Sequence, residues 1–318
     1  MKKALLFLLT ISLMLALCSC SSLFLDDVTV VFDFGNGEKA SVVMKEGEKI
    51  SFPELPAIEN YMHAGWFYDI EGENPVERDA VVSSDITIYS FWVYDYASAT
   101  NQIFGDHIRM NVSIRTSCYN TLFGMRVDEV ISNGSGVIFD EDDTYYYCLT
   151  NNHVTSKKDG HSYIELTVTD CYGNAAPATI EYFDASRDLS VLKFKKGQDV
   201  LCCAEFADKA PAVGEIVINL GQPDGLKNAL TYGEVLKYAT VDLSGEKNDE
   251  PKVDFDVMWH DAPMNHGSSG GAVLNDKLEL VGVSFAVGHD SNGEFLCGFT
   301  IPYGELMSFI NEYREKEA

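Results

Sequence analysis

Short segments in which apolar and polar residues alternate, separated by turn-forming residues, recur along almost the whole chain. Between residues 28 and 93 they read VTVVFDF, KASVVMK and DITIYSFWV, and later YIELTVTD, EIVINL, LTYGEVL and LELVGVSFAV continue the pattern. Alternation with a period of two is typical of strands that bury one face. The chain is therefore predicted to be mostly β, and the many regularly spaced strands favour a sandwich or a barrel.

Two segments depart from this alternation. Residues 94–105 (YDYASATNQIFG) lack it and are predicted to link two modules through a short helix. Near the end, Leu306, Ile310 and Tyr313 recur at helical spacing, which predicts a terminal helix from Tyr303 to Glu317. A chain of 318 residues is longer than most single domains, so we expect a small domain over residues 27–93 and a main domain over residues 106–318.

The chain begins like an exported bacterial protein. Two lysines precede the apolar run Ala4–Leu17, which is short for a membrane span, and cysteines follow at once. The segment resembles a lipoprotein signal, which implies removal of residues 1–19 and diacylation of Cys20. Cys18 fits less well, because a bulky leucine precedes it. The lipid would tether the protein to the outer face of the bacterial cell membrane. An ordinary secretory signal or an uncleaved anchor is the alternative.

The charge balance excludes one class of function. The chain has 23 Lys and Arg against 49 Asp and Glu, which gives a formal net charge of −26. A polyanionic backbone would be repelled by such a chain, so nucleic acid is not an expected partner.

Six cysteines follow Cys20, and an even number in an exported chain permits up to three disulfides. The sequence does not select a pairing. The spacing of the cysteines does not match a zinc site, so no metal is expected. Cys148 lies within an apolar run and is predicted to be a buried thiol.

Within residues 27–93, the phrases GEKISFPELP, GWFYD and DITIYSFWV resemble the internalin-type B-repeat, or Listeria-Bacteroides repeat, of bacterial surface proteins. The resemblance implies a small β-grasp-like module that serves as a spacer or adhesive unit, with cell-wall or surface components as its partners. Trp66 and Trp92 are its marker residues here, and both are predicted to lie in the core.

The segment DAPMNHGSSGGAV, residues 261–273, has the composition of a nucleophile loop. Acyl transfer needs a nucleophile, a base, a group that orients the base, and donors for the developing oxyanion. Glycines around Ser269 permit a tight turn in which the N–H groups of Gly267 and Ser269 converge on one point. Ser269 is therefore the candidate nucleophile, and the two N–H groups are the candidate oxyanion hole.

The order of residues along the chain selects the fold. The loop also satisfies G-x-S-x-G, the nucleophile elbow of α/β-hydrolases, but in that fold the acid and the His follow the Ser. The only histidine after Ser269 in the sequence is His289. Upstream, His153 ends an aromatic strand-like run and Asp188 opens the apolar segment DLSVLKF, as a barrel protease requires. Asp184 is a competing acid, but it lies in a turn-like segment.

Seven segments resemble, in order and approximate spacing, the HtrA/Deg branch of trypsin-like serine peptidases. They are GSGVIF, LTNNHV, DLSVLKF, VGEIVINLGQP, LTYGEV, DAPMNHGSSGGAV and GFTIP. The match covers roughly residues 106–315 and implies a chymotrypsin-like double β-barrel with the active site between the barrels. By position, His153 would be the general base, Asp188 its partner and Ser269 the nucleophile. No cofactor is implied.

The match has two departures in the nucleophile loop. Ser268 replaces the family's usual Asn before the nucleophile, and His266 replaces its usual Pro. The geometry of this loop is therefore less fixed by the resemblance than the triad itself. The PDZ domains common in this branch are also missing from the matched segments, since a predicted helix follows the barrel segments instead.

The same resemblance suggests a substrate preference. Ser284, Phe285 and Ala286 match the strand that lines the specificity pocket and pairs with the substrate backbone. Pro263 stands six residues before Ser269, where trypsin-like enzymes carry an acid, so cleavage after Lys or Arg is not favoured. A small or aliphatic residue before the scissile bond is expected.

The leading interpretation is a serine endopeptidase that hydrolyses extracytoplasmic polypeptides. A cell-surface binding protein with a catalytically degenerate protease domain is the alternative from another class. An esterase could use the same machinery, but no motif favours it.

Overall fold

The structure is a computed structural model that describes residues 25–222, 228–241, 253–290 and 292–317. Two compact units meet at a boundary between Asp95 and Tyr96. The predicted signal segment and Cys20 lie outside the described residues. Within the described ranges, no helix is long and apolar enough to cross a membrane.

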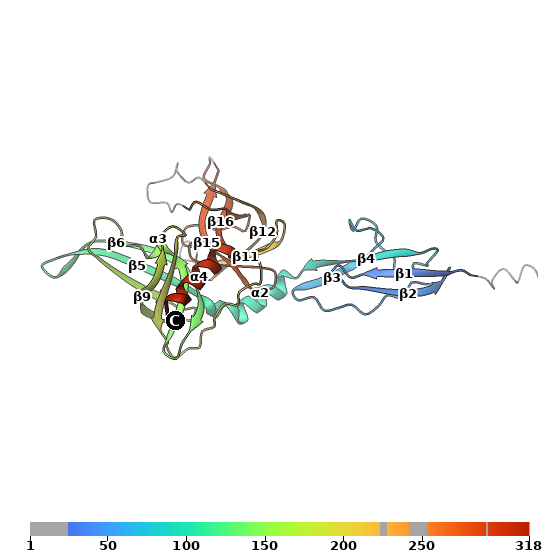
Figure 1. Ribbon diagram of the computed structural model, residues 1–318, viewed down its shortest axis with the longest axis horizontal. Helices are drawn as coiled ribbons and strands as arrows, with labels where there is room; N and C mark the ends of the chain where they lie inside the picture. Colours follow the sequence, from blue (N-terminus) through green and yellow to red (C-terminus); the bar gives the residue numbers. More distant parts are fainter. Residues whose placement is uncertain (1–24, 223–227, 242–252, 291, 318) are drawn as a thin grey trace, which may run out of the picture. The chain divides into compact units, whose positions relative to one another are not determined.

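The first unit is a four-stranded sheet in the order β2-β1-β4-β3 (Figure 1). Its strands are β1 (Asp27–Asp33), β2 (Lys39–Lys45), β3 (Tyr61–Phe67) and β4 (Ile86–Tyr94). The neighbours β1 and β4 are parallel, and the outer strands pair antiparallel with them. Trp66 is buried in the core against Phe32 and Phe52. Trp92 is half-buried and donates a hydrogen bond from its indole N–H to the carbonyl of Phe34, at 2.7 Å. The predicted core position therefore holds for Trp66, whereas Trp92 lies at the edge of the buried cluster.

The second unit opens with α2 (Tyr96–Gly105) and the 3-10 helix η1 (His107–Met110). A closed six-stranded barrel follows, in the order β10-β7-β6-β5-β8-β9. Its strands are β5 (Asn111–Leu122), β6 (Met125–Glu141), β7 (Tyr145–Asn151), β8 (Tyr163–Thr169), β9 (Ala175–Asp184) and β10 (Leu189–Lys195). The alternation read from YIELTVTD is confirmed, because Leu166 and Val168 are buried in the barrel core and Ile164 packs against it.

A second closed barrel has the order β11-β12-β13-β16-β15-β14. Its strands are β11 (Ile216–Gly221), β12 (Ala229–Ala239), β13 (Val257–His260), β14 (Ala272–Leu274), β15 (Leu280–His289) and β16 (Phe295–Pro302). The helix α4 (Tyr303–Glu317) follows and buries Leu306, Ile310 and Tyr313. The predicted double barrel with a C-terminal helix is thus confirmed.

The six cysteines after Cys20 are free thiols in this fold. Cys148 is fully buried in the first barrel, as predicted, and burial raises the pKa of its thiol to about 12. The strand networks and apolar cores therefore hold the described part of the chain together without a disulfide.

Candidate active site

Strand pairing brings the candidate base and acid together. β7 and β10 are antiparallel neighbours, with Asn151 at the end of β7 opposite Leu189 at the start of β10. The residues just beyond these ends must therefore meet at the same rim of the first barrel. The one-turn helix α3 (Asn152–Thr155) follows β7 and carries His153, while Asp188 immediately precedes β10.

Both carboxylate oxygens of Asp188 hold His153. Oδ2 lies 2.6 Å from Nδ1 of the imidazole ring, and Oδ1 accepts the backbone N–H of His153 at 2.7 Å. The Asp188 side chain is only 3% exposed, whereas that of His153 is 27% exposed. An ionised carboxylate can only accept, so Nδ1 carries the proton and Nε2 is left as the basic nitrogen. The pair has the geometry of an oriented general base.

The backbone of Asp188 is also held. Its φ of +51° lies in the left-handed region, which residues other than glycine rarely adopt. Its carbonyl accepts the N–H of Asn152 at 3.0 Å and the side-chain amide of Asn151 at 3.1 Å. These bonds fix the turn in which the carboxylate is presented to His153.

Ser269 lies in the loop between β13 and β14 of the second barrel. Its hydroxyl donates to the carbonyl of Phe285 on β15, at a long distance of 3.4 Å. The next residue, Gly270, has a φ of +86° and donates its N–H to the carbonyl of Ser284 at 2.8 Å. The weak hydrogen bond leaves the Ser269 hydroxyl available for another acceptor.

The N–H groups of Gly267 and Ser269 have no acceptor in the described part of the chain. Gly267 has a φ of +95°, which glycine adopts without steric cost. Unpaired N–H groups on either side of a candidate nucleophile are what an oxyanion hole needs, because the developing negative charge supplies the missing acceptor.

Ser135 on β6 joins the nucleophile loop to the first barrel. Its N–H donates to the carbonyl of Ser269 at 2.8 Å, and its hydroxyl donates to the carbonyl of Gly267 at 2.7 Å. The same hydroxyl accepts the N–H of Gln222 at 2.9 Å, and Thr150 donates to the Ser135 carbonyl at 2.7 Å. Sequence reasoning did not single out Ser135, although it lies within the matched segment GSGVIF.

The two residues that depart from the family pattern, Ser268 and His266, differ in their burial. Ser268 is fully buried, and its hydroxyl accepts the N–H of Asn265 at 3.3 Å. It therefore closes the loop on itself. His266 is exposed, and the hydrogen bond found for it runs from its backbone N–H to the side chain of Asn265, at 2.8 Å.

The three expected substrate-binding residues lie on β15. The Ser284 hydroxyl is buried and donates to the side-chain oxygen of Asn219 at 2.6 Å, and its N–H and C=O bond to Gly271 and Gly270. Phe285 is buried, and Ala286 is half-buried beside it. The polar groups of Ser284 are thus used inside the second barrel.

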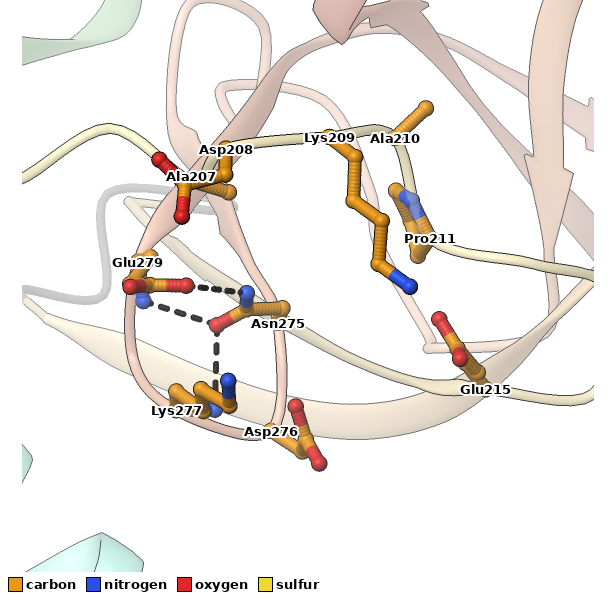
Figure 2. Close-up of a pocket in the computed structure, with 10 residues that line it drawn as sticks. All are labelled: Ala207, Asp208, Lys209, Ala210, Pro211, Glu215, Asn275, Asp276, Lys277 and Glu279. Carbon is orange, nitrogen blue, oxygen red and sulfur yellow. Dashed lines mark hydrogen bonds between the residues drawn. The ribbon is translucent and has the colours of Figure 1, made fainter. Parts of the chain in front are cut away.

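Two cavities differ in their relation to these residues. One of about 230 Å³ is lined by His153 and Asp188, together with Ser156, Lys157 and Lys158. Another of about 340 Å³ is lined by residues 207–211, Glu215 and the turn 275–279 (Figure 2). None of the candidate triad lines this larger cavity. Figure 2 shows how Asn275 holds this turn: its side-chain amide donates to the carboxylate of Glu279, and its side-chain oxygen accepts the backbone N–H groups of Lys277 and Glu279.

Metal ligation finds no support in the ranges that the structure describes. They hold no group of three or more His, Cys, Asp or Glu side chains that could bind an ion. The groups that the structure does assemble at the site are a serine hydroxyl, an imidazole, a carboxylate and two backbone N–H donors.

Two family matches fall on either side of the boundary between the units. Residues 134–283 match the trypsin-like peptidase domain, and residues 29–90 match the Listeria-Bacteroides repeat domain. The chain therefore contains a trypsin-like peptidase domain preceded by a Listeria-Bacteroides repeat domain, as its sequence motifs predicted.

The curated relatives to which the peptidase domain is similar include serine proteases of the HtrA and DegS type. The "Serine protease Do-like HtrA" of Lactobacillus helveticus is 31% identical over 215 residues, covering 63% of this chain and 49% of that protein. The "Serine endoprotease DegS" of Escherichia coli strain K12 is 28% identical over 237 residues, covering 72% and 59%. The chain thus spans about half the length of such relatives. An HtrA-type protease solved with a decapeptide has a TM-score of 0.55 and 22% identity, over 69% of this chain and 67% of that one, which supports the fold.

Proposed function

We propose that the second unit is a serine endopeptidase with Ser269 as nucleophile, His153 as general base and Asp188 as the partner of the base. The observation that carries the proposal is the two-point hold of Asp188 on His153, with bonds of 2.6 and 2.7 Å to the ring and the backbone. This hold fixes the ring orientation and the tautomer that a base needs.

The reaction follows from these groups. When a peptide binds, the Ser269 hydroxyl leaves the carbonyl of Phe285 and gives its proton to Nε2 of His153 as its oxygen attacks the scissile carbonyl. Asp188 stabilises the imidazolium, and the N–H groups of Gly267 and Ser269 bind the oxyanion. His153 then protonates the leaving amine, and water releases the acyl group by the same steps in reverse.

Ser135 supports this assignment. It bonds the carbonyls of the two residues that carry the candidate oxyanion donors, Gly267 and Ser269, and so fixes the peptide units that follow these donors. The Ser269 N–H itself shares a rigid, planar peptide unit with the Ser268 carbonyl, which accepts the N–H of Gly271 at 2.8 Å. The Ser269 donor is therefore oriented before substrate arrives, and such preorganisation is the source of an oxyanion hole's catalytic value.

The substrates that we propose are extracytoplasmic polypeptides, cleaved after small or aliphatic residues. Two observations support this preference: Pro263, at the position of the trypsin-like acid, is exposed and uncharged, and the side chains of Phe285 and Ala286 on β15 are apolar. Export, lipid attachment through Cys20 and contact of the repeat with cell-wall or surface components complete the proposal. Secretion without a lipid is the alternative location.

The test uses the full-length protein with casein and with a fluorophosphonate probe. We expect probe labelling that maps to Ser269 and not to Ser268, and both labelling and casein cleavage lost in Ser269→Ala. The rate should fall about 10³-fold or more while the fold persists. Labelling that survives in Ser269→Ala would reject the triad. An unlabelled, inactive wild type would favour a binding protein, and product sequences ending mainly in Lys, Arg or Asp would reject the proposed specificity.

A further inference from the structure

Arg187, the neighbour of Asp188 in the chain, reaches from the first barrel to the C-terminal helix α4. Its guanidinium donates to both carboxylate oxygens of Glu312, at 2.8 and 2.9 Å, and lies 3.3 Å from Glu305. It also bonds Asp184 in its own turn, at 3.1 Å, and approaches the hydroxyl of Ser308 at 3.4 Å. We refer to Arg187 and these four partners as the Arg187 clasp.

The three helix partners share one face of α4, because Glu305, Ser308 and Glu312 recur at spacings of three and four residues. The Arg187 side chain is 20% exposed, so the clasp is partly sheltered from solvent. Hydrogen bonding to Glu312 raises the pKa of Arg187, and the same contact lowers the pKa of Glu312. Both groups are therefore charged at neutral pH, and the contact is a bidentate ion pair with a defined direction.

The helix α4 contacts both barrels. It packs on β15 and β16 of the second barrel, and β15 carries Phe285, the acceptor of the Ser269 hydroxyl. From the first barrel, Tyr182 on β9 stacks on Phe309 of α4 with ring centres 5.1 Å apart. The helix α4 therefore packs on β15, the strand that contacts Ser269, and also reaches the turn that carries Asp188.

That turn needs external support. Asp188 has a positive φ, a sparsely populated conformation that persists only where the surroundings impose it. On one side the carbonyl of Asp188 is bonded to Asn151 and Asn152. On the other side Arg187 is tied to α4. Loss of the second hold would free the turn to relax toward an ordinary conformation and carry the carboxylate away from His153.

We propose that Arg187 is a positioning residue, which uses α4 to hold Asp188 against His153 and so keeps the base of the first barrel aligned with the nucleophile of the second. This inference rests on the proposed triad. Arg187 touches no reacting atom, and its effect passes through the main chain to Asp188. A displacement of catalytic groups by about 1 Å can cost about a hundredfold in rate, so a loosened turn should be visible in kinetics.

The test compares Arg187→Ala with Arg314→Ala in the full-length protein. Arg314 is the matched control, because it also links α4 to the first barrel, through Asp140 at 3.5 Å, but does not touch the turn of Asp188. We expect Arg187→Ala to lower kcat about ten- to a hundredfold. KM should stay within about twofold, because substrate contacts are unchanged. Arg314→Ala should leave both within about twofold.

A second readout does not depend on turnover. The proton shared by Nδ1 of His153 and Asp188 at 2.6 Å should give a strongly downfield proton NMR signal. The signal should persist in wild type and in Arg314→Ala but broaden or vanish in Arg187→Ala, at a temperature where circular dichroism shows the fold intact. Arg187→Lys should restore part of kcat, since an ammonium keeps the charge but lacks the bidentate geometry.

The outcomes separate the two proposals. If Ser269→Ala retains activity, the proposed function fails and the NMR signal alone decides the clasp. If the wild type is active and Ser269→Ala is not, unchanged kcat and an unchanged signal in Arg187→Ala overturn the clasp. If Arg187→Ala does not fold, Glu312→Gln removes the ion pair and leaves Arg187 in place, and it must then show the same loss of kcat and signal for the clasp to stand.

Discussion

In the first barrel, His153 and Asp188 stand next to the ends of two paired strands, whereas in the second barrel Ser269 lies in a long loop between β13 and β14. Strand register places the first pair, because Asn151 and Leu189 face each other across the ladder. The register of β13 and β14 does not place Ser269. The nucleophile depends on turns within its loop and on bonds from outside.

The outside bonds come from both barrels: Ser284 and Phe285 on β15 of the second barrel bond the loop, and so does Ser135 on β6 of the first. Ser135 bonds the carbonyls of Gly267 and Ser269, and Gly270 lies so close to Ser135 and Thr150 that a side chain would collide with both. The first barrel thus holds its own reactive groups by hydrogen bonds and also shapes the loop of its neighbour. The first barrel should therefore be sensitive to changes in the chemical groups of its side chains, and the nucleophile loop to changes in side-chain volume.

The chemical sensitivity of the first barrel is tested by Asp188→Asn, which keeps the shape of the side chain. An amide cannot hold the imidazole in the tautomer that leaves Nε2 basic, so we expect kcat to fall about 10³-fold or more. Asp184→Asn is the control, since Asp184 contacts Arg187 and Ser186 but not His153. Its loss should stay below about tenfold. The turnover of casein gives kcat for both variants. Equal losses of kcat in Asp188→Asn and Asp184→Asn would show that the two acids do not differ in role.

The sensitivity of the loop to volume is tested by Gly270→Ala. The added methyl group would meet the carbonyl of Ser135 and the hydroxyl of Thr150, at a φ of +86°. Overpacking and a left-handed backbone together should cost about 2–4 kcal/mol of unfolding free energy, and activity should be lost with them. Gly214→Ala is the matched control. Gly214 has a φ of +84° but nothing within 4 Å of the added atom, so only the backbone cost of about 1–2 kcal/mol remains.

Urea unfolding measures both glycine variants. The comparison of the barrels fails if the two variants lose the same stability, because crowding by the first barrel would then have no effect on the loop.

Much of the fold was predictable because its signals are local. The alternation in YIELTVTD gave the inward face of β8, and the spacing of Leu306, Ile310 and Tyr313 gave the helix α4 with its bounds. Each pattern needs only the residues of one element. The double barrel then followed from ordered motifs, since no local pattern by itself distinguishes a barrel from a sandwich.

The supports of the site were not predictable in the same way. Ser135 bonds Gly267, and Arg187 bonds Glu312, across more than a hundred residues of sequence. A serine in a strand and an arginine in a turn resemble ordinary surface residues until the barrels bring their partners close. Ser284 is a similar case, because its match to a pocket-lining strand does not reveal that its hydroxyl bonds Asn219 inside the barrel.

The last difference between the barrels is the sensitivity of the second barrel to low pH. His260, at the end of β13 in the second barrel, is fully buried, with Nε2 3.0 Å from the hydroxyl of Thr300. Burial lowers its pKa from 6.5 to about 4. Between about pH 6.5 and about pH 4, His260 is protonated in the unfolded chain but neutral in the folded chain. The stability associated with neutral His260 is therefore present above about pH 6.5 and lost as the pH falls toward about 4.

This smallest effect is measured as a difference between two proteins. From about pH 7.5 to about pH 5, His260 should account for about 2 kcal/mol of lost unfolding free energy, in addition to what other groups contribute. His260→Gln removes the titration while keeping a polar group near Thr300, so its stability should fall less over the same interval, by about that amount. Urea unfolding followed by near-ultraviolet circular dichroism gives both values. Parallel pH curves for the two proteins would show that acid does not weaken the second barrel through His260, and the contrast between the barrels would then rest on geometry alone.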